Sequence, residues 1–172
     1  MKKLFATVLT MLMVLTLFGS ATVSASGTWV QKGDKNTFVY IVQGLLNEKG
    51  NYKLAIDGIA GDATDKAIKG FQKNNKLTED GKVGDQTKDR LIANVTLQMG
   101  SKGDAVKGLQ QYLMSSLCNI DTSYKTAIKN AGGADGVYGT ATYNAVFEFQ
   151  RVNVLGKDGK VGSQTWNAIF GC

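Results

Sequence analysis

Histidine is absent from the 172-residue chain, and its absence excludes several kinds of catalytic site. No zinc site built on histidine can form, and neither can the Ser-His and Cys-His pairs that activate a nucleophile. Glutamate is scarce, and it occurs at positions 48, 79 and 148. A glycoside hydrolase needs two placed carboxyl groups, one of them with a raised pKa. We predict that Glu148 lies on a solvated helix face, so we expect no enzyme and no cofactor.

Metal-binding patterns and long basic runs are also missing. The Asp-Gly pairs of the sequence lack the alternating carboxylates of an EF-hand calcium loop, so no metal site is predicted. No run of lysine and arginine is interleaved with aromatic residues, which argues against a nucleic acid partner. Basic residues exceed acidic ones by 20 to 14. This mild excess suits an anionic cell surface, but it is also an ordinary charge for a soluble protein.

The first 25 residues have the pattern of a signal peptide. Lys2 and Lys3 precede an apolar run over residues 4–18, and Val23-Ser24-Ala25 offers the small residues that a signal peptidase requires. A membrane anchor is the alternative, but the apolar run is short of a full span. We therefore predict a chain that is secreted and extracellular or cell-wall associated, with no membrane contact after cleavage of residues 1–25.

One stretch of the sequence occurs twice. Residues 57–87 and 135–165 match without a gap, and the second copy begins 78 residues after the first (135 − 57). An internal repeat defines the unit of folding. Each copy contains two Asp-Gly pairs, which favour turns because glycine tolerates a positive φ and aspartate accepts nearby backbone hydrogen bonds. Thr64 and Thr142 are expected one turn inside a helix, where a hydroxyl can meet the free amides of the helix start.

A further helix is predicted before each copy. Thr37 and Asp104 are its expected N-caps. Its apolar stripe is predicted at Val39, Val42, Leu45 and Leu46 in the first unit and at Val106, Leu109, Leu113 and Leu117 in the second. The second unit carries 11 extra residues, because the offset between the copies changes from 67 (97 − 30) to 78 (135 − 57). They fall within residues 118–134, which we predict to be an enlarged surface loop.

These patterns predict a mainly α protein of two tandem small three-helix units, each pinned by Asp-Gly turns. We call residues 28–94 the first unit and residues 95–172 the second unit. Units of this size have marginal cores on their own, so packing of one unit against the other is plausible.

The second unit carries the clearest resemblance to a known family. The residues concerned are Gly100-Ser-Lys-Gly-Asp-Ala-Val106, Leu109-Gln110, Asp135-Gly136, Tyr138-Gly139, Thr142, Ala145-Val146, Phe149-Gln150, Asp158-Gly159, Val161-Gly162 and Thr165-Trp166. Together they resemble the peptidoglycan-binding domain family, a small three-helix fold usually appended to cell-wall hydrolases. The resemblance recurs in the first unit and covers nearly the whole chain after the signal peptide. It implies non-catalytic binding to bacterial cell-wall peptidoglycan.

The two units differ at positions suited to a ligand. Ala60 and Lys88 of the first unit stand where the second has Tyr138 and Trp166. Both units also have another residue, Lys76 or Val154, where the family pattern expects glycine. Binding of sugars and muropeptides favours aromatic side chains with a polar tip. The candidate ligand-binding residues are therefore Tyr138, Trp166, Gln150 and Gln72, and the second unit is expected to bind more tightly. The alternative is that Tyr138 and Trp166 fill the core and that the glutamines hold turns.

Two further predictions concern pairing and partners. Cys118 and Cys172 are the only cysteines, and in an exported chain they are predicted to form a disulfide within the second unit. Intermolecular pairing or free thiols are the alternatives. The expected partner is bacterial peptidoglycan. The alternative function is a wall-targeting subunit, or a remnant, of a peptidoglycan hydrolase system whose catalytic domain is on another chain.

Overall fold

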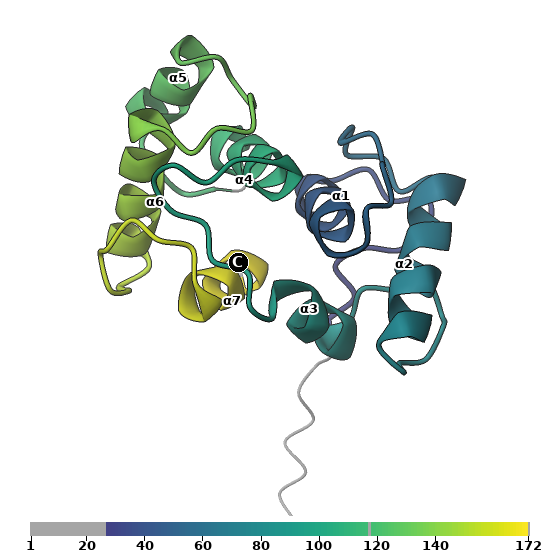
Figure 1. Ribbon diagram of the computed structural model, residues 1–172. Helices are drawn as coiled ribbons and strands as arrows, with labels where there is room; N and C mark the ends of the chain where they lie inside the picture. Colours follow the sequence, from purple (N-terminus) through teal and green to yellow (C-terminus); the bar gives the residue numbers. More distant parts are fainter. Residues whose placement is uncertain (1–26, 117, 172) are drawn as a thin grey trace, which may run out of the picture.

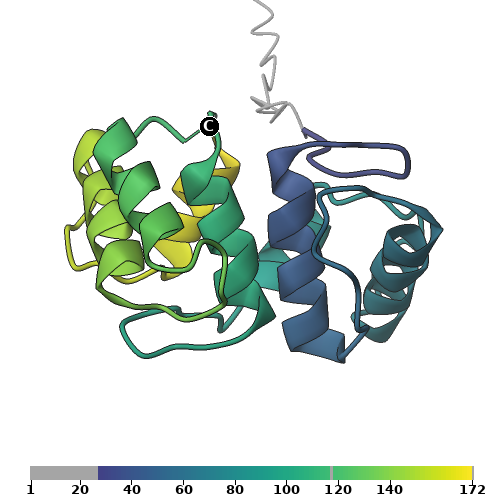
Figure 2. The ribbon, with the colours of Figure 1, turned by 90° about the horizontal axis from the view of Figure 1, so that it is seen from above.

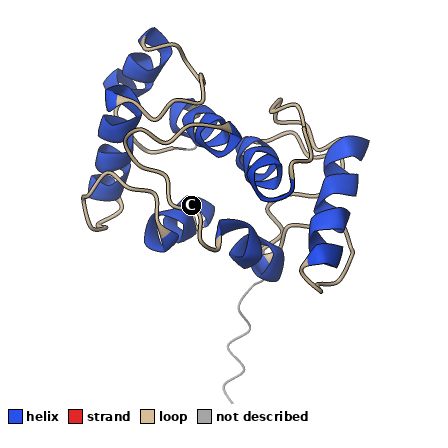
Figure 3. Cartoon of the chain, in the orientation of Figure 1, coloured by secondary structure: helices blue, strands red, loops and turns tan. Residues whose placement is uncertain are grey.

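The computed structural model describes residues 27–116 and 118–171, and it confirms a mainly α fold of two tandem helical units (Figures 1 and 3). Figure 3 shows helices and loops and no strand in this part of the chain. The first unit contains α1 (Thr37–Gly50), α2 (Asp62–Asn74) and α3 (Asp85–Ile92). The second contains α4 (Asp104–Met114), α5 (Thr122–Asn130), α6 (Thr140–Val152) and α7 (Ser163–Phe170). None of the described helices combines the length and the apolar character needed to cross a membrane. The predicted signal peptide lies outside the described residues.

The first helix of each unit begins at the expected place, but not with the expected cap. The N-cap of α1 is Asn36, whose side chain accepts a hydrogen bond from the Val39 N–H at 3.2 Å. The N-cap of α4 is Gly103, whose φ of 124° suits glycine alone. Thr37 and Asp104 are the first helical residues instead, so the predicted caps were wrong by one position. Such shifts are usual at helix ends.

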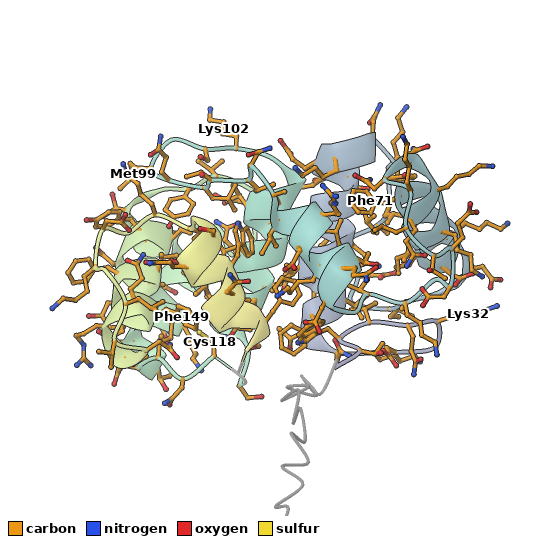
Figure 4. All side chains as sticks on the ribbon, turned by 90° about the horizontal axis from the view of Figure 1, so that it is seen from below. Lys32, Phe71, Met99, Lys102, Cys118 and Phe149 are labelled. Carbon is orange, nitrogen blue, oxygen red and sulfur yellow. The ribbon has the colours of Figure 1, made fainter. Side chains whose placement is uncertain are left out.

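The predicted apolar stripes form the two cores. Every described residue of both stripes is buried, and α3 and α7 add Leu91 and Ile169. Leu117 of the second stripe lies outside the described residues. Figure 4 shows Phe71 and Phe149 among the packed side chains of their units, while Lys32 and Lys102 point outward. Removing such stripes from water is the main force that folds the helices.

The extra residues of the second unit form a helix rather than a loop. The Asp121 side chain caps α5 by accepting from the Ser123 N–H at 2.8 Å. Ile128 is 1% exposed, so α5 contributes to the core of the second unit. The described part of the second unit therefore has four helices, and the predictions of a surface loop and of three helices were wrong there. A nine-residue helix with a single buried anchor gives little periodic signal in the sequence.

The two units pack through α1 and α4, which lie side by side in Figure 2. Gly44 of α1 lies against Ala105, and Gly108 of α4 lies against Ile41. The contacts run in opposite directions along the two helices, so the pair is antiparallel. A methyl group added at Gly108 would lie 2.5 Å from the Tyr40 carbonyl oxygen, which is far inside van der Waals contact. The two glycines therefore allow the helix backbones to touch.

An aromatic cluster joins the units a second time. Trp29 donates from Nε1 to the Phe170 carbonyl at 2.6 Å, and the two rings meet edge to face at 5.7 Å. Phe38 stacks on Phe170 at 5.7 Å and contacts Tyr112 at 6.2 Å. Lys88 lies 5.4 Å from the centre of the Trp29 ring and donates to Asn167 of α7. With the α1–α4 pair, these contacts fix the first unit on the second.

Only one of the two cysteines of the predicted disulfide is among the described residues. Cys118 is buried in the second unit, beyond the end of α4. Cys172 lies outside the described residues. The disulfide therefore stays a prediction, and mass spectrometry of the unreduced, proteolysed protein would show which cysteines are joined.

Candidate functional site

Gln150 lies at the centre of a buried hydrogen-bond cluster. Its Nε2 donates to Asp158 Oδ1 at 2.9 Å, to the Lys160 carbonyl at 2.9 Å and to the Thr165 hydroxyl at 3.1 Å. Its Oε1 accepts from the Gly159 N–H at 2.8 Å. The side chain is 1% exposed. The whole amide is therefore used to hold the Asp-Gly turn and the start of α7 against α6.

Three other glutamines make the same cluster. In each, Nε2 donates to an aspartate, a backbone carbonyl and a threonine hydroxyl, while Oε1 accepts from the glycine N–H of the turn. We call the four clusters the glutamine locks: Gln43 with Asp57 and Thr64, Gln72 with Asp80 and Thr87, Gln110 with Asp135 and Thr142, and Gln150 with Asp158 and Thr165. Each unit thus contains the same turn twice.

The threonines of the locks do not serve the purpose predicted for them. Thr64 and Thr142 accept hydrogen bonds from Gln43 and Gln110 at 3.3 and 3.1 Å. The N-caps of α2 and α6 are glycines with no side-chain capping bond. The prediction that these hydroxyls meet the free amides of the helix start was therefore wrong. The hydroxyls are instead bound by glutamines of α1 and α4, the first helix of each unit.

The lock aspartates stay charged to a lower pH than usual. The pKa of Asp158 lies below its ordinary value because the Lys160 N–H and the Gln150 amide donate to the carboxylate. The pKa of Asp57 is lowered chiefly by Gln43. A lowered pKa in the folded state stabilises the protein above pH 4, and this contribution is lost as the pH falls through the folded pKa. Because these carboxylates are exposed, each contribution is small.

Tyr138 and Trp166 lie inside the second unit. Tyr138 is 1% exposed and donates from its hydroxyl to the Gly159 carbonyl at 2.8 Å. Trp166 is 0% exposed and donates from Nε1 to the Val95 carbonyl at 2.9 Å. Gln72 is 1% exposed and belongs to a lock, as Gln150 does. This burial is what the core-packing alternative predicts. As ligand contacts, the four residues stay a prediction.

We expect Tyr138→Phe to lower the free energy of unfolding by about 1 to 2 kcal/mol, because the Gly159 carbonyl would lose a buried partner. Chemical unfolding followed by circular dichroism measures the change. Tyr143→Phe is the matched control, because the Tyr143 hydroxyl makes no hydrogen bond to the described residues and the ring is only half-buried. Equal losses in the two variants would show that the hydroxyl of Tyr138 does not stabilise the core.

The sequence predicted that Glu148 lies on a solvated helix face, and this prediction was wrong. Its side chain is 8% exposed, and both carboxylate oxygens accept from Arg151 at 2.7 Å. The forked hydrogen bonds from Arg151 lower the pKa of Glu148. The helix α5, which packs on α6, explains the burial. A general acid needs the opposite shift, towards a raised pKa.

Open pockets lie near the locks. One of about 370 Å³ lies where α3 begins, and Gln72, Asp80 and Thr87 are among its lining residues. Another of about 280 Å³ lies between α5 and the start of α6, beside Gln110 and Asp135. A third of about 270 Å³ contains Tyr52 and Arg90 of the first unit. Among the described residues no group of His, Cys, Asp and Glu is placed to hold a metal ion.

Comparison with known proteins places the chain among domains of one kind. The model of a family described as "Putative peptidoglycan binding domain" matches residues 35–91 and again residues 102–169. A peptidoglycan-binding protein from Clostridioides difficile, solved in complex with glutamine hydroxamate, is 30% identical over 44% of this chain and 40% of its own, with a TM-score of 0.35. The SleB N-terminal domain is 28% identical over 46% of this chain and 94% of its own, with a TM-score of 0.34. The chain thus matches less than half the length of the Clostridioides protein. No curated protein matches it.

Proposed function

The chain belongs to the peptidoglycan binding domain family, and from this premise we propose that it is a secreted, non-catalytic protein that binds bacterial cell-wall peptidoglycan. The observation that carries the proposal is the double family match. The two matched segments span α1–α3 and α4–α7, so both units contain the family's domain. Secretion rests on residues 1–25, whose pattern is that of a signal peptide.

The carboxyl groups support a role without catalysis. Each aspartate or glutamate with a shifted pKa in the described residues has it lowered, and none has it raised. The lock aspartates are occupied with turn amides, and Glu148 with Arg151. Hydrolysis of a glycan needs a carboxylic acid that keeps its proton near neutral pH. The carboxyl groups named here, those of the lock aspartates and of Glu148, have their pKa values shifted in the opposite direction.

The purified chain without residues 1–25 should sediment with insoluble peptidoglycan sacculi and should release no soluble fragments from them. Quantitative sedimentation measures binding, while turbidity and chromatography of the supernatant measure release. Heat-denatured protein is the control for adsorption. Sacculi with and without teichoic acids separate peptidoglycan binding from attraction of the basic chain to anionic polymers. Release that disappears in Glu148→Gln would contradict the non-catalytic proposal, and absence of sedimentation would contradict binding.

The four residues predicted from the sequence enter this proposal with a specific test. If Tyr138, Trp166, Gln72 or Gln150 contacts the ligand, its replacement lowers affinity at a temperature where the variant is still folded. If it only packs or holds a turn, replacement lowers thermal stability and leaves affinity unchanged below the unfolding transition. The burial of all four supports the second outcome.

A further inference from the structure

The pocket at Tyr52 has the composition of a binding site. It lies where the ends of α1, α2 and α3 meet, and its volume of about 270 Å³ suits one saccharide-sized group. Its lining includes a half-buried tyrosine, two cations and three amides: Tyr52, Lys49, Arg90, Asn74, Asn75 and Asn94. No acidic residue is among the described residues that line it.

The backbone around Tyr52 is arranged to hold its ring at the pocket. Asn51 and Lys53, on either side, have φ values of 51° and 56°, a region that residues other than glycine rarely adopt. The ring lies over Gly50 and Gly70, where any side chain would collide with it or crowd it. Burial raises the pKa of the Tyr52 phenol, and a hydrogen bond with Asn74 opposes this rise. Asn51 takes this conformation as the left-handed C-cap that ends α1.

The cations of the pocket are only partly used by the protein. Lys49 donates to the Ala93 carbonyl at the end of α3. Arg90 is exposed and makes no hydrogen bond or ion pair with the described residues. The neighbouring carboxylate of Asp89 is paired with Lys88 at 3.0 Å. The guanidinium therefore keeps all its donors for solvent or a ligand, and its planar fork matches a carboxylate.

The second unit shows that the fold does not require this pocket. The position of Lys49 is occupied there by Ser116 and that of Arg90 by Ala168, and Tyr52 falls where the second unit carries its extra residues. Gly70, which makes room for the Tyr52 ring, corresponds to the buried Glu148. The aromatic ring, the two cations and the glycine that admits the ring are thus found together in one unit only.

We propose that the Tyr52 pocket binds an N-acetylated sugar of peptidoglycan that bears a carboxylate on its lactyl group or on its attached peptide. The inference rests on the proposed function and adds the location of the site. The apolar face of the sugar ring packs on Tyr52. The Asn74 and Asn94 amides face the acetamido group together with the Asn75 side-chain oxygen, because the Asn75 Nδ2 donates to the Phe71 carbonyl at 2.8 Å. Arg90 with Lys49 neutralises the carboxylate. Recognition by the first unit follows, because the second lacks these side chains.

A glycan strand longer than one sugar also has room. A neighbouring pocket of about 540 Å³ shares Ala93 and Asn94 with the Tyr52 pocket and continues to Ser163 and Asn167 of α7. The path therefore crosses from the first unit to the second, and its lining mixes polar residues with the apolar Ile92 and Val95 and the acidic Asp89. It stays continuous because the α1–α4 contact and the Trp29 cluster fix the two units.

The test uses variants of the chain that contain both units and lack residues 1–25. It measures their binding to solubilised muropeptides and to sacculi stripped of teichoic acids. Arg90→Gln should weaken muropeptide binding about tenfold, and Tyr52→Leu by a similar factor. The control is Lys129→Gln, which removes the same charge from an exposed position on α5 and should leave binding unchanged. Thermal melts of all variants show that they are folded. Three ligands separate the sources of the carboxylate. N-acetylmuramic acid carries it on the lactyl group, a disaccharide-peptide carries it on the peptide, and a chitin oligosaccharide has none.

The outcomes separate this inference from the proposed function. If wild type binds sacculi and folded Arg90→Gln and Tyr52→Leu bind as tightly, the chain binds peptidoglycan elsewhere and only the pocket is wrong. An equal loss in Lys129→Gln would show unspecific attraction of charge and overturn the pocket as well. Equal affinity for the chitin oligosaccharide would contradict the proposal that the pocket recognises a carboxylate. Binding that requires teichoic acids, or no binding by wild type, would overturn both proposals.

Discussion

Gly108→Ala should destabilise the protein by about 2 to 3 kcal/mol, the cost of overpacking a tight contact. Elsewhere in a helix the same change stabilises by roughly 0.5 to 1 kcal/mol, because alanine loses less backbone freedom on folding. Here the new methyl group would meet the Tyr40 carbonyl at 2.5 Å and the Ile41 Cα at 3.1 Å. Backbone cannot turn aside as a side chain can, so α1 and α4 must separate. Chemical unfolding measures the loss.

Gly156→Ala is the matched control for Gly108→Ala. A methyl group at Gly156 would have no atom of residues 27–116 or 118–171 within 4 Å, and the φ of Gly156 is not positive. The control should therefore stay within about 0.5 kcal/mol of wild type. Small-angle scattering should show a larger radius for Gly108→Ala if the two units separate while staying folded. A variant as stable and as compact as wild type would mean that the two helices are not in backbone contact in solution.

Gln150→Leu should destabilise the protein by about 3 kcal/mol, although leucine fills nearly the same volume. The change leaves the Gly159 N–H buried without its partner, which costs roughly 1 to 3 kcal/mol, and it also removes the hydrogen bonds that Gln150 donates to Asp158, the Lys160 carbonyl and the Thr165 hydroxyl. At about 2 to 4 °C per kcal/mol for a protein of this size, the melting temperature should fall by roughly 6 to 12 °C. Differential scanning calorimetry measures the shift.

Gln164→Leu is the control for Gln150→Leu. Gln164 lies in the same unit, at an exposed position of α7, so its replacement should change the free energy of unfolding by less than about 0.5 kcal/mol. Similar melting temperatures for the two leucine variants would show that the lock does not stabilise the turn. A loss confined to Gln150→Leu would assign the stability to the buried amide.

The repeat made the fold predictable, because it marks turns and helices twice at matching positions. Asp57-Gly58 and Asp135-Gly136 form turns with φ values of 74° and 76° at glycine. The helix α5 was missed because it has no counterpart in the first unit and only Ile128 is buried in it. The burial of Glu148 was missed for the same reason. Its environment is made by the inserted helix, which periodicity within α6 does not reveal.

The site was harder to predict than the fold. Gln72 and Gln150 could be selected as candidates because they recur in both units. Their hydrogen-bond partners lie on turns, and the sequence alone does not show that the glutamines reach those turns. A signal was present: Asp-Gly-x-x-Gly-x-x-Thr occurs four times, at 57, 80, 135 and 158, and the lock glutamine that pairs with each lies earlier in the chain, on α1, α2, α4 and α6 in turn. The Tyr52 pocket gave no such signal. Its side chains come from three helix ends, and the ring is placed by an unusual backbone.

Ile41 and Gly108 occupy equivalent positions of the two units, 67 residues apart (108 − 41), and they face each other across the α1–α4 contact. Equivalent residues that meet in this way mark a local two-fold axis, as in a homodimer with an isologous interface. Two identical chains would have to place the same residue on both sides of that axis. Because the two units belong to one polypeptide, their equivalent positions can carry different residues. One side supplies an isoleucine and the other a glycine, and the missing side chain of Gly108 lets the two backbones touch. No symmetric dimer could build this unequal pair at that point.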